Sequence, residues 1–287
     1  MDARLRRFVG VSAALTGLLM VLGVYTAATG AGLTCAGRWP FCDGFLGLFP
    51  ANWSSFVEWF HRLVAMITGF VVLGTTIHAW RTGADRRIRL ALAGATILLP
   101  SQIILGALTV TTYEWAILLA HFGTASIIFT GVALAAAWTY GPSGDETASG
   151  RSSADASDGT DKALAAAAAA LPILLVLTPH AFVTFGPPIQ AVYYFLGLGT
   201  YAALLAAAVW TSPSTGPRSG RRVRRLSAAA AAVVVSLLVT GRLVYGGTLQ
   251  RVSFAGGLLA LALVVAAWYT LRRDAGVSGS RGVPGGD

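Results

Sequence analysis

The chain has 287 residues, of which 55% are hydrophobic and 11% are charged, with a mean hydropathy of +0.67. Soluble domains carry about 25% charged residues, so the composition excludes a soluble protein and predicts one that resides in a lipid bilayer. The net charge of +9 raises the alternative of a nucleic-acid partner. That alternative is not needed, because the basic residues are distributed as a membrane topology requires.

Eight apolar runs are long enough to cross a hydrocarbon core of about 30 Å as helices. We expect transmembrane helices near residues 8–29, 55–80, 89–110, 115–139, 163–181, 189–210, 227–245 and 252–271. The fold class is therefore predicted to be an all-α polytopic membrane protein. The first run has a basic start but no convincing small-residue cleavage site, so we expect it to be retained rather than removed as a signal peptide.

The positions of basic and tryptophan residues predict the orientation of these helices. Of the 21 Lys and Arg, 17 precede the first run, follow the last, or join runs 2 and 3, 4 and 5, or 6 and 7. The positive-inside rule then places both termini in the cytoplasm and predicts a multi-pass protein of the cell membrane. Trp80, Trp138, Trp210 and Trp268 each end a run on this inner side, where the amphipathic indole ring is favoured.

The spacing of these tryptophans also predicts a tandem duplication, since both pairs are 58 residues apart. A segment rich in Ser, Gly and Asp separates the two halves and is too polar to be buried. We expect four regions, namely an amino-terminal four-helix bundle, a flexible cytoplasmic linker, a carboxy-terminal four-helix bundle and a disordered tail. Their predicted bounds are 1–140, 141–162, 163–274 and 275–287.

Two histidines inside the predicted helices are the first candidates for chemistry, because ionisable groups are costly in a membrane. His61 and His121 each lie a few residues beyond the outer start of a helix, so the two imidazoles are expected at matched depth. Parallel helices with histidines at equal depth can ligate one iron from opposite faces, as in a bis-His haem. For either histidine alone, a satisfied hydrogen bond in the core is an equal alternative.

Glu58 and Arg62 flank His61 on the same helix. Glu58 is one turn nearer the outer surface and shares the face of His61, where it can reach the rim of a macrocycle. The alternative for Glu58 is a pair with Arg62. The alternatives for Arg62 are a haem propionate or a lipid headgroup. His78 is expected at the membrane interface, and His180 has no obvious partner.

Cys35 and Cys42 are the only cysteines and lie in the first predicted outer loop. Two thiols on the oxidising face of a membrane predict a disulfide. A purely structural role is the simpler alternative. A redox-active pair would nevertheless be well placed above the two histidines.

Taken in order, these features resemble the haem A synthase family. The matching stretches are the paired cysteines, EWFHR around His61, Gln102 followed by LGALTV, and LLAHFG around His121. The resemblance implies two tandem four-helix bundles and oxidation of the C8 methyl group of haem O to a formyl group, through successive hydroxylations, for terminal oxidase assembly. It implies that His61 and His121 ligate the substrate haem iron, that Glu58 is catalytic, and that the cysteine disulfide takes part in electron transfer. The implied partners are a haem O synthase and an electron donor of unknown identity, while homo-oligomerisation stays open.

The second half departs from the family pattern, in which longer members carry another histidine pair for a haem b cofactor. No histidine follows His180, and an offset of 130 residues places Ala191 opposite His61 and Arg251 opposite His121. We therefore expect no second haem site. Two other functions stay open, namely a non-catalytic haem-binding or electron-transfer protein and a transporter, which only the parallel repeat supports.

Overall fold

The computed structural model describes residues 2–112, 114–141, 151–178, 182–211, 218–242 and 247–280. Eight helices in this part of the chain are long and apolar enough to span a membrane. They are α1 (Ala3–Ala28), α2 (Trp53–Arg81), α3 (Arg86–Thr111), α4 (Trp115–Tyr140), α5 (Arg151–Val176), α6 (Pro187–Trp210), α7 (Ser219–Thr240) and α8 (Gly247–Ser280). The predicted number of membrane-length helices and the all-α class are confirmed.

Polar side chains set the starts of the first three helices. The side chains of Asp2, Asn52 and Asp85 accept hydrogen bonds from backbone N–H groups in the first turns of α1, α2 and α3. These caps satisfy donors that the helix itself leaves unpaired. For α2, the bond from Ser55 N to Asn52 Oδ1 is 2.9 Å long. This cap fixes where the helix that carries Glu58 and His61 begins.

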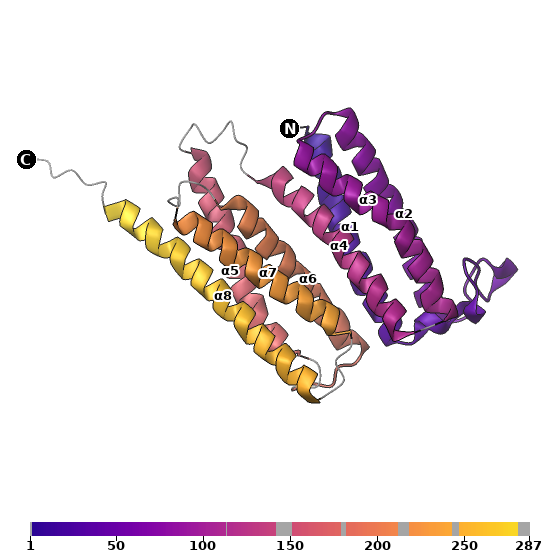
Figure 1. Cartoon of the computed structure of the whole chain (residues 1–287). Helices are drawn as coiled ribbons and strands as arrows, with labels where there is room; N and C mark the ends of the chain where they lie inside the picture. The colour runs from indigo at the N-terminus through magenta and orange to yellow at the C-terminus, as the bar shows by residue number, and fades with distance from the viewer. Residues whose placement is uncertain are drawn as a thin grey trace, which may run out of the picture.

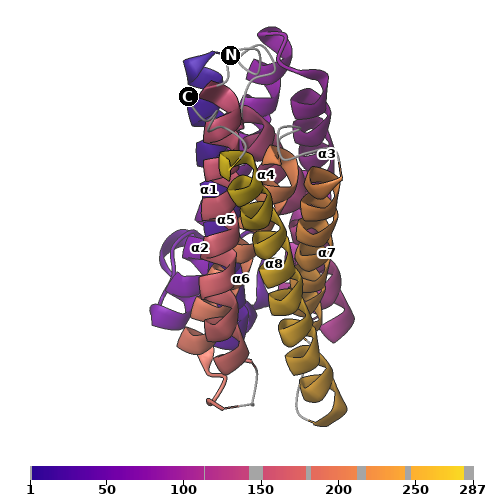
Figure 2. The ribbon, with the colours of Figure 1, turned by 90° about the vertical axis from the view of Figure 1, so that its left-hand side faces the viewer.

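The helices pack as two sets of four (Figure 1). In the first set, α1 contacts α2 and α4, while α3 contacts α2 and α4; in the second, α5 contacts α6 and α8, while α7 contacts α6 and α8. The two sets meet where α6 packs against α1 and α4. Figure 2 shows the helices running roughly side by side along the long axis of the molecule. The end of the molecule that holds the connection between α1 and α2 is called the loop end below.

Aromatic side chains of α6 join the two sets. Tyr194 meets Phe122 edge to face at 5.2 Å between ring centroids, and the Tyr201 hydroxyl lies 2.8 Å from the hydroxyl of Thr130. The indole of Trp210 donates a 2.7 Å hydrogen bond to a carbonyl of α4. These residues are spaced along α6 so that one face of the helix contacts α4 over most of its length.

The buried apolar core is distributed unevenly between the sets. One large cluster fills α5–α8 and includes the residues of α1 and α4 that face α6. The first set has two smaller clusters of its own, which reach toward the loop end only as far as Val72 on α2 and Ile128 on α4. His61 and His121 lie beyond these residues, nearer the loop end. The interior beside the two histidines therefore belongs to neither of these two smaller clusters.

The predicted bounds of the linker and of the tail differ from the structure, and the seventh helix lies at Ser219–Thr240 rather than at 227–245. Helix α5 begins at Arg151, so residues 151–162, expected in the flexible linker, are helical. Helix α8 continues to Ser280, which places the first residues of the expected disordered tail, 275–280, in a helix. The remainder of the expected linker and tail, residues 142–150 and 281–287, lies outside the described residues.

Candidate functional site

Helix α2 carries three of the predicted site residues on one face. His61 and Arg62 lie three and four residues beyond Glu58, and this is the spacing that places side chains next to each other on a helix. His61 is half-buried, whereas Glu58 is only 5% exposed. His121 lies on α4 and is also half-buried. His61 and His121 are the ninth and seventh residues of helices that both begin at the loop end, so the structure places the predicted pair at similar depth.

A glycine lies against each of the two imidazoles. A methyl group on Gly23 of α1 would lie 3.0 Å from His61 Nε2, and one on Gly106 of α3 would lie 3.6 Å from His121 Cε1. Helices α1 and α3 thus present hydrogen atoms, rather than side chains, to the histidines of α2 and α4. Sequence reasoning missed both glycines, because an isolated glycine in a membrane helix has no specific signature.

The histidines have the chemistry that a haem iron requires. Nδ1 of His121 is buried without a hydrogen-bond partner, although buried polar atoms are nearly always paired. Nη2 of Arg62 is a second buried atom without a partner. A haem supplies both kinds of partner, an iron for imidazole nitrogen and carboxylates for guanidinium. The residues therefore fit a haem, with His61 and His121 as the candidate ligands and Arg62 as a candidate propionate partner.

Arg62 connects Glu58 to the loop between α1 and α2. Its Nε donates a 2.8 Å hydrogen bond to Glu58 Oε1. Its Nη1 donates to the backbone carbonyls of Arg38, Pro40 and Phe41 at 3.2, 3.4 and 3.0 Å. Of the interpretations open for Glu58, the pair with Arg62 is the one that the structure contains. Of the Arg62 guanidinium nitrogens, Nη2 is the one without a hydrogen-bond partner.

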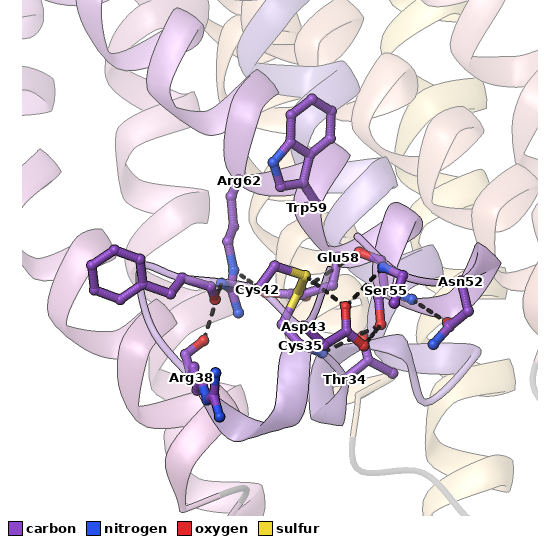
Figure 3. The surroundings of a disulfide bond; sticks show 12 residues. Thr34, Cys35, Arg38, Cys42, Asp43, Asn52, Ser55, Glu58, Trp59 and Arg62 are labelled. Carbon is purple, nitrogen blue, oxygen red and sulfur yellow. Dashed lines mark hydrogen bonds and ion pairs between the residues drawn. A yellow bond between two sulfur atoms is a disulfide. The ribbon is translucent and has the colours of Figure 1, made fainter. Parts of the chain in front are cut away.

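Cys35 and Cys42 form a disulfide in this loop (Figure 3). Both residues are buried, at 0% and 1% exposure. Asp43 lies beside them and accepts hydrogen bonds from Ser55 Oγ at 2.6 Å and from the backbone N–H of Ala51 at 3.0 Å. The predicted disulfide is confirmed in the structure, and Asp43 and Ser55 are neighbours that the sequence did not indicate.

The Asp43 carboxylate ties the loop to the first turn of α2. The hydrogen bond from Ser55, followed by that from Ala51, holds the pKa of Asp43 below its usual range. A carboxyl group whose pKa is lowered on folding stabilises the fold above its unfolded pKa. That contribution is lost as the pH falls through the lowered value. The attachment of the loop at Asp43 is thus present at neutral pH and weakens only in acid.

The remaining predicted candidates lie elsewhere. His78 Nε2 is 3.1 Å from Asp2 Oδ2 at the end of the molecule opposite the loop end, far from the histidine pair. His180 lies outside the described residues. In the second set, Ala191 is half-buried and Arg251 is exposed. These two are the positions that the repeat offset pairs with His61 and His121.

The hydroxyl groups of Tyr194 and Tyr201 on α6 make hydrogen bonds to other residues, as a metal ligand would not. Tyr194 is fully buried, and its hydroxyl donates a 2.9 Å hydrogen bond to the carbonyl of Leu238. Tyr201 is paired with Thr130 across the interface between the two sets. Their positions on α6 are therefore explained by packing.

The fold and the site define a polytopic helical membrane protein with a half-buried histidine pair next to a disulfide-closed loop. Residues 51–183 match the COX15-CtaA family, described as cytochrome oxidase assembly proteins. This segment, somewhat less than half of the chain, is similar to that family, which agrees with the resemblance seen in the sequence. The segment contains Glu58, His61, Arg62 and His121, while the two cysteines precede it.

Individual relatives carry two different names. The chain is 34% identical to "Heme A synthase" of Bacillus licheniformis over 119 residues, which cover 40% of this chain and 39% of the relative. It is 31% identical to "Heme A synthase" of Bacillus pumilus over 134 residues, 45% of this chain and 43% of the relative. It is also 38% identical to "Protoheme IX farnesyltransferase" of Halobacterium salinarum over 128 residues, 42% of this chain and 27% of the relative. The chain thus spans less than half the length of these curated relatives.

Proposed function

We propose that this protein is a haem A synthase, an oxidoreductase that converts the C8 methyl group of haem O to the formyl group of haem A. The observation that carries the proposal is the gathering of these residues near the loop end. His61 and His121 lie together, Glu58 is buried one turn from His61, and Arg62 joins Glu58 to the disulfide loop. A protein that only binds haem requires the two histidines but neither the carboxylate nor the disulfide.

Each residue has a distinct task in this proposal. His61 and His121 bind the iron of the substrate and thereby fix the orientation of the macrocycle, so that one methyl group faces the reactive side. Glu58 holds or moves a proton beside that methyl group, or stabilises positive charge that develops there. Arg62 offers its remaining donor to a propionate. The bound haem would supply the redox chemistry. Each hydroxylation would consume dioxygen as the oxidant, with one oxygen atom entering the methyl group and the other leaving as water after two electrons arrive from a donor of unknown identity; loss of water from the doubly hydroxylated carbon gives the formyl group.

Farnesyl transfer is a second reaction suggested by the names of relatives. Transfer from a diphosphate donor usually needs divalent cations, which carboxylates hold. In the described part of the chain, the only cluster of three possible metal ligands is Cys35, Cys42 and Asp43. Two of these three are joined in a disulfide, so the cluster offers one carboxylate and no thiolate. The described residues therefore favour oxidation over prenyl transfer.

The arrangement in the membrane is part of the proposal. The loop end faces outward, both termini lie in the cytoplasm and the bilayer is the cell membrane, as the distribution of basic residues favours. At the opposite end, Arg89 and Arg272 stack on Trp80 and Trp268 at 4.9 and 4.3 Å from the ring centroids. Such pairs of cationic and aromatic side chains suit a membrane interface. A haem O synthase supplies the substrate on this membrane.

The proposal is tested by identifying the haem that the protein produces. Membranes that contain the full chain and a haem O source are extracted, and the haems are identified by mass. We expect haem A in the presence of this chain and only haem O without it. Bound haem O that is never converted, despite a supply of electrons and oxygen, would support the alternative of a non-catalytic haem-binding or electron-transfer protein.

Glu58→Gln sharpens this test, because it keeps the size and hydrogen bonding of the side chain but removes the charge. We expect it to abolish haem A formation while haem stays bound, since neither proposed role of Glu58 is needed to ligate iron. Glu114→Gln is the matched control, because Glu114 is exposed before α4 and makes no side-chain capping bond. Normal haem A yield from folded Glu58→Gln protein would leave Glu58 only its structural pair with Arg62.

A further inference from the structure

The loop between the two cysteines is joined to α2 by Arg62 at its middle, in addition to the contacts of Ser55 with Cys35 and Asp43 at its ends. Three carbonyls of this loop, those of Arg38, Pro40 and Phe41, accept hydrogen bonds from Nη1 of Arg62. Figure 3 shows the guanidinium between the loop and the helix, close to the disulfide. A guanidinium is suited to this position because its planar fork donates in several fixed directions at once. Lysine offers one ammonium group and cannot reproduce that geometry.

The closed loop shields the disulfide. Cys35 and Cys42 are 0% and 1% exposed, while exchange requires a thiolate to reach one of the two sulfur atoms directly. A reductant therefore gains access only when the loop moves. The contacts of Arg62, together with those of Ser55 with Cys35 and Asp43, oppose that movement.

The backbone at the first cysteine is held in an unfavourable conformation. Cys35 and Ala36 have φ values of 57° and 54°, in the left-handed region that residues other than glycine rarely adopt. Such a conformation persists only where the surroundings enforce it. Here the disulfide and the Arg62 contacts enclose the turn from both ends. When the disulfide opens, the turn can relax, and the carbonyls that follow it along the chain move away from Arg62.

We propose that Arg62 is a positioning residue that couples the redox state of the Cys35–Cys42 disulfide to Glu58. With the disulfide closed, the guanidinium is shared between the loop carbonyls and the Glu58 carboxylate. Reduction by two electrons and two protons converts the disulfide to two thiols and releases the loop. Arg62 then loses its carbonyl partners, and its contact with Glu58 changes. The inference rests on the proposed function only for the catalytic significance of Glu58.

The first test measures how fast the disulfide is reduced in the purified full chain. Dithiothreitol supplies the electrons and protons as it is oxidised to its cyclic disulfide, and a maleimide polymer then labels the free thiols. Because the sequence has 2 cysteines, every labelled thiol reports on this bond. We expect Arg62→Gln to accelerate reduction about tenfold or more, the effect of losing one charge-assisted hydrogen bond.

Two further variants keep this test decisive. Arg62→Lys retains the charge but not the fork, so it should also accelerate reduction. Arg38→Gln removes a charge from the loop but leaves the backbone carbonyl that Arg62 binds, so its rate should stay within about twofold of the parent. Equal rates for the parent and folded Arg62 variants, with folding checked by size-exclusion chromatography and circular dichroism, would overturn the proposal.

The second test asks whether Glu58 responds to reduction. Infrared difference spectra of the reduced minus the oxidised protein should contain a carboxylate band that disappears in Glu58→Gln. We expect this band to be absent in Arg62→Gln and retained in Arg38→Gln. Replacing both cysteines by serine should shift the same band without a reductant. A band that persists in Arg62→Gln, or no Glu58 band in the parent, contradicts the coupling.

Neither measurement depends on haem A formation, so the two proposals fail separately. A chain that shows the coupling but makes no haem A would leave the inference intact and remove the proposed enzyme activity. A chain that makes haem A with no Glu58 response would do the reverse.

Discussion

In the two sets of four helices, glycines lie against different kinds of side chain. In α5–α8, methyl groups on Gly197 and Gly257 would lie 2.5 and 2.6 Å from side-chain atoms of Leu238 and Leu175. Leucine side chains thus occupy the room that these glycines leave. The cavity among the leucines of this set measures about 20 Å³, which is room for one water molecule. The second set is a filled apolar core.

In the first set, two glycines lie beside imidazole rings instead of leucines. Gly23 and Gly106 face His61 and His121, and the large buried cluster reaches this region only through Met20, Val24 and Phe122 on the side of α6. Similar helix arrangements can therefore hold a solid core or a ligand site, and the side chains opposite the glycines decide between them.

The largest expected effect is loss of haem when the histidine pair is broken. His61→Ala and His121→Ala should each abolish the low-spin haem spectrum of the purified protein, because one remaining imidazole cannot provide bis-His ligation. His78→Ala is the control, since His78 pairs with Asp2 at the opposite end of the molecule. Haem loss in the His78 variant would show that the iron is held elsewhere.

A matched pair of glycine substitutions tests whether the interiors of the two sets of helices differ. Gly23→Ala places a methyl group 3.0 Å from His61 Nε2, so the ring must move. We expect haem affinity to fall about tenfold, as is typical when the support of a metal ligand is disturbed. Gly197→Ala instead overpacks the second core and should cost about 1–3 kcal/mol of stability.

The two variants should differ in which measurement changes. Haem titration should detect Gly23→Ala, and the temperature at which half the protein leaves the monodisperse peak in size-exclusion chromatography should detect Gly197→Ala. If each variant altered both quantities equally, the two interiors would not differ as the structure indicates.

The sequence predicts the helices well because membrane spanning depends on a local property, the length of an apolar run. It fails at the start of α5, where polar residues were interpreted as linker. Tertiary contacts explain the difference. Asp161 accepts hydrogen bonds from Trp268 and Arg272 of α8, and Lys162 pairs with Asp158 one turn away. Partners more than 100 residues distant in the sequence cannot be recognised from the segment itself.

Part of the candidate site is also predictable from the sequence. His61, His121 and Glu58 stand out because ionisable groups are expensive in a membrane, and the disulfide follows from two cysteines in one loop. The contacts of Arg62 with the loop do not follow, since backbone carbonyls accept hydrogen bonds whatever the residue type. The roles of Gly23 and Gly106 depend on which helices face each other, which an apolar sequence leaves undetermined.

The smallest expected effect comes from trying to build a second haem site in α5–α8. Ala191→His combined with Arg251→His restores, at the repeat offset, the histidines that the second half lacks. We expect the ratio of haem to protein to stay at that of the parent chain. Position 251 is exposed, so a histidine there faces away from the core. The cavity of about 20 Å³ in this set is also far smaller than the roughly 300–1,000 Å³ of ordinary ligand sites.

The measurement is haem per protein in purified material, combined with a redox titration that separates two haems by potential. His61→Ala in the same background provides the matched control. It removes the first site, so any haem that remains must be bound by the new pair. A second haem in the double-histidine variant would mean that the leucines facing Gly197 and Gly257 repack to admit a macrocycle. In that case the missing histidines alone, rather than the filled core, would separate the second set from the first.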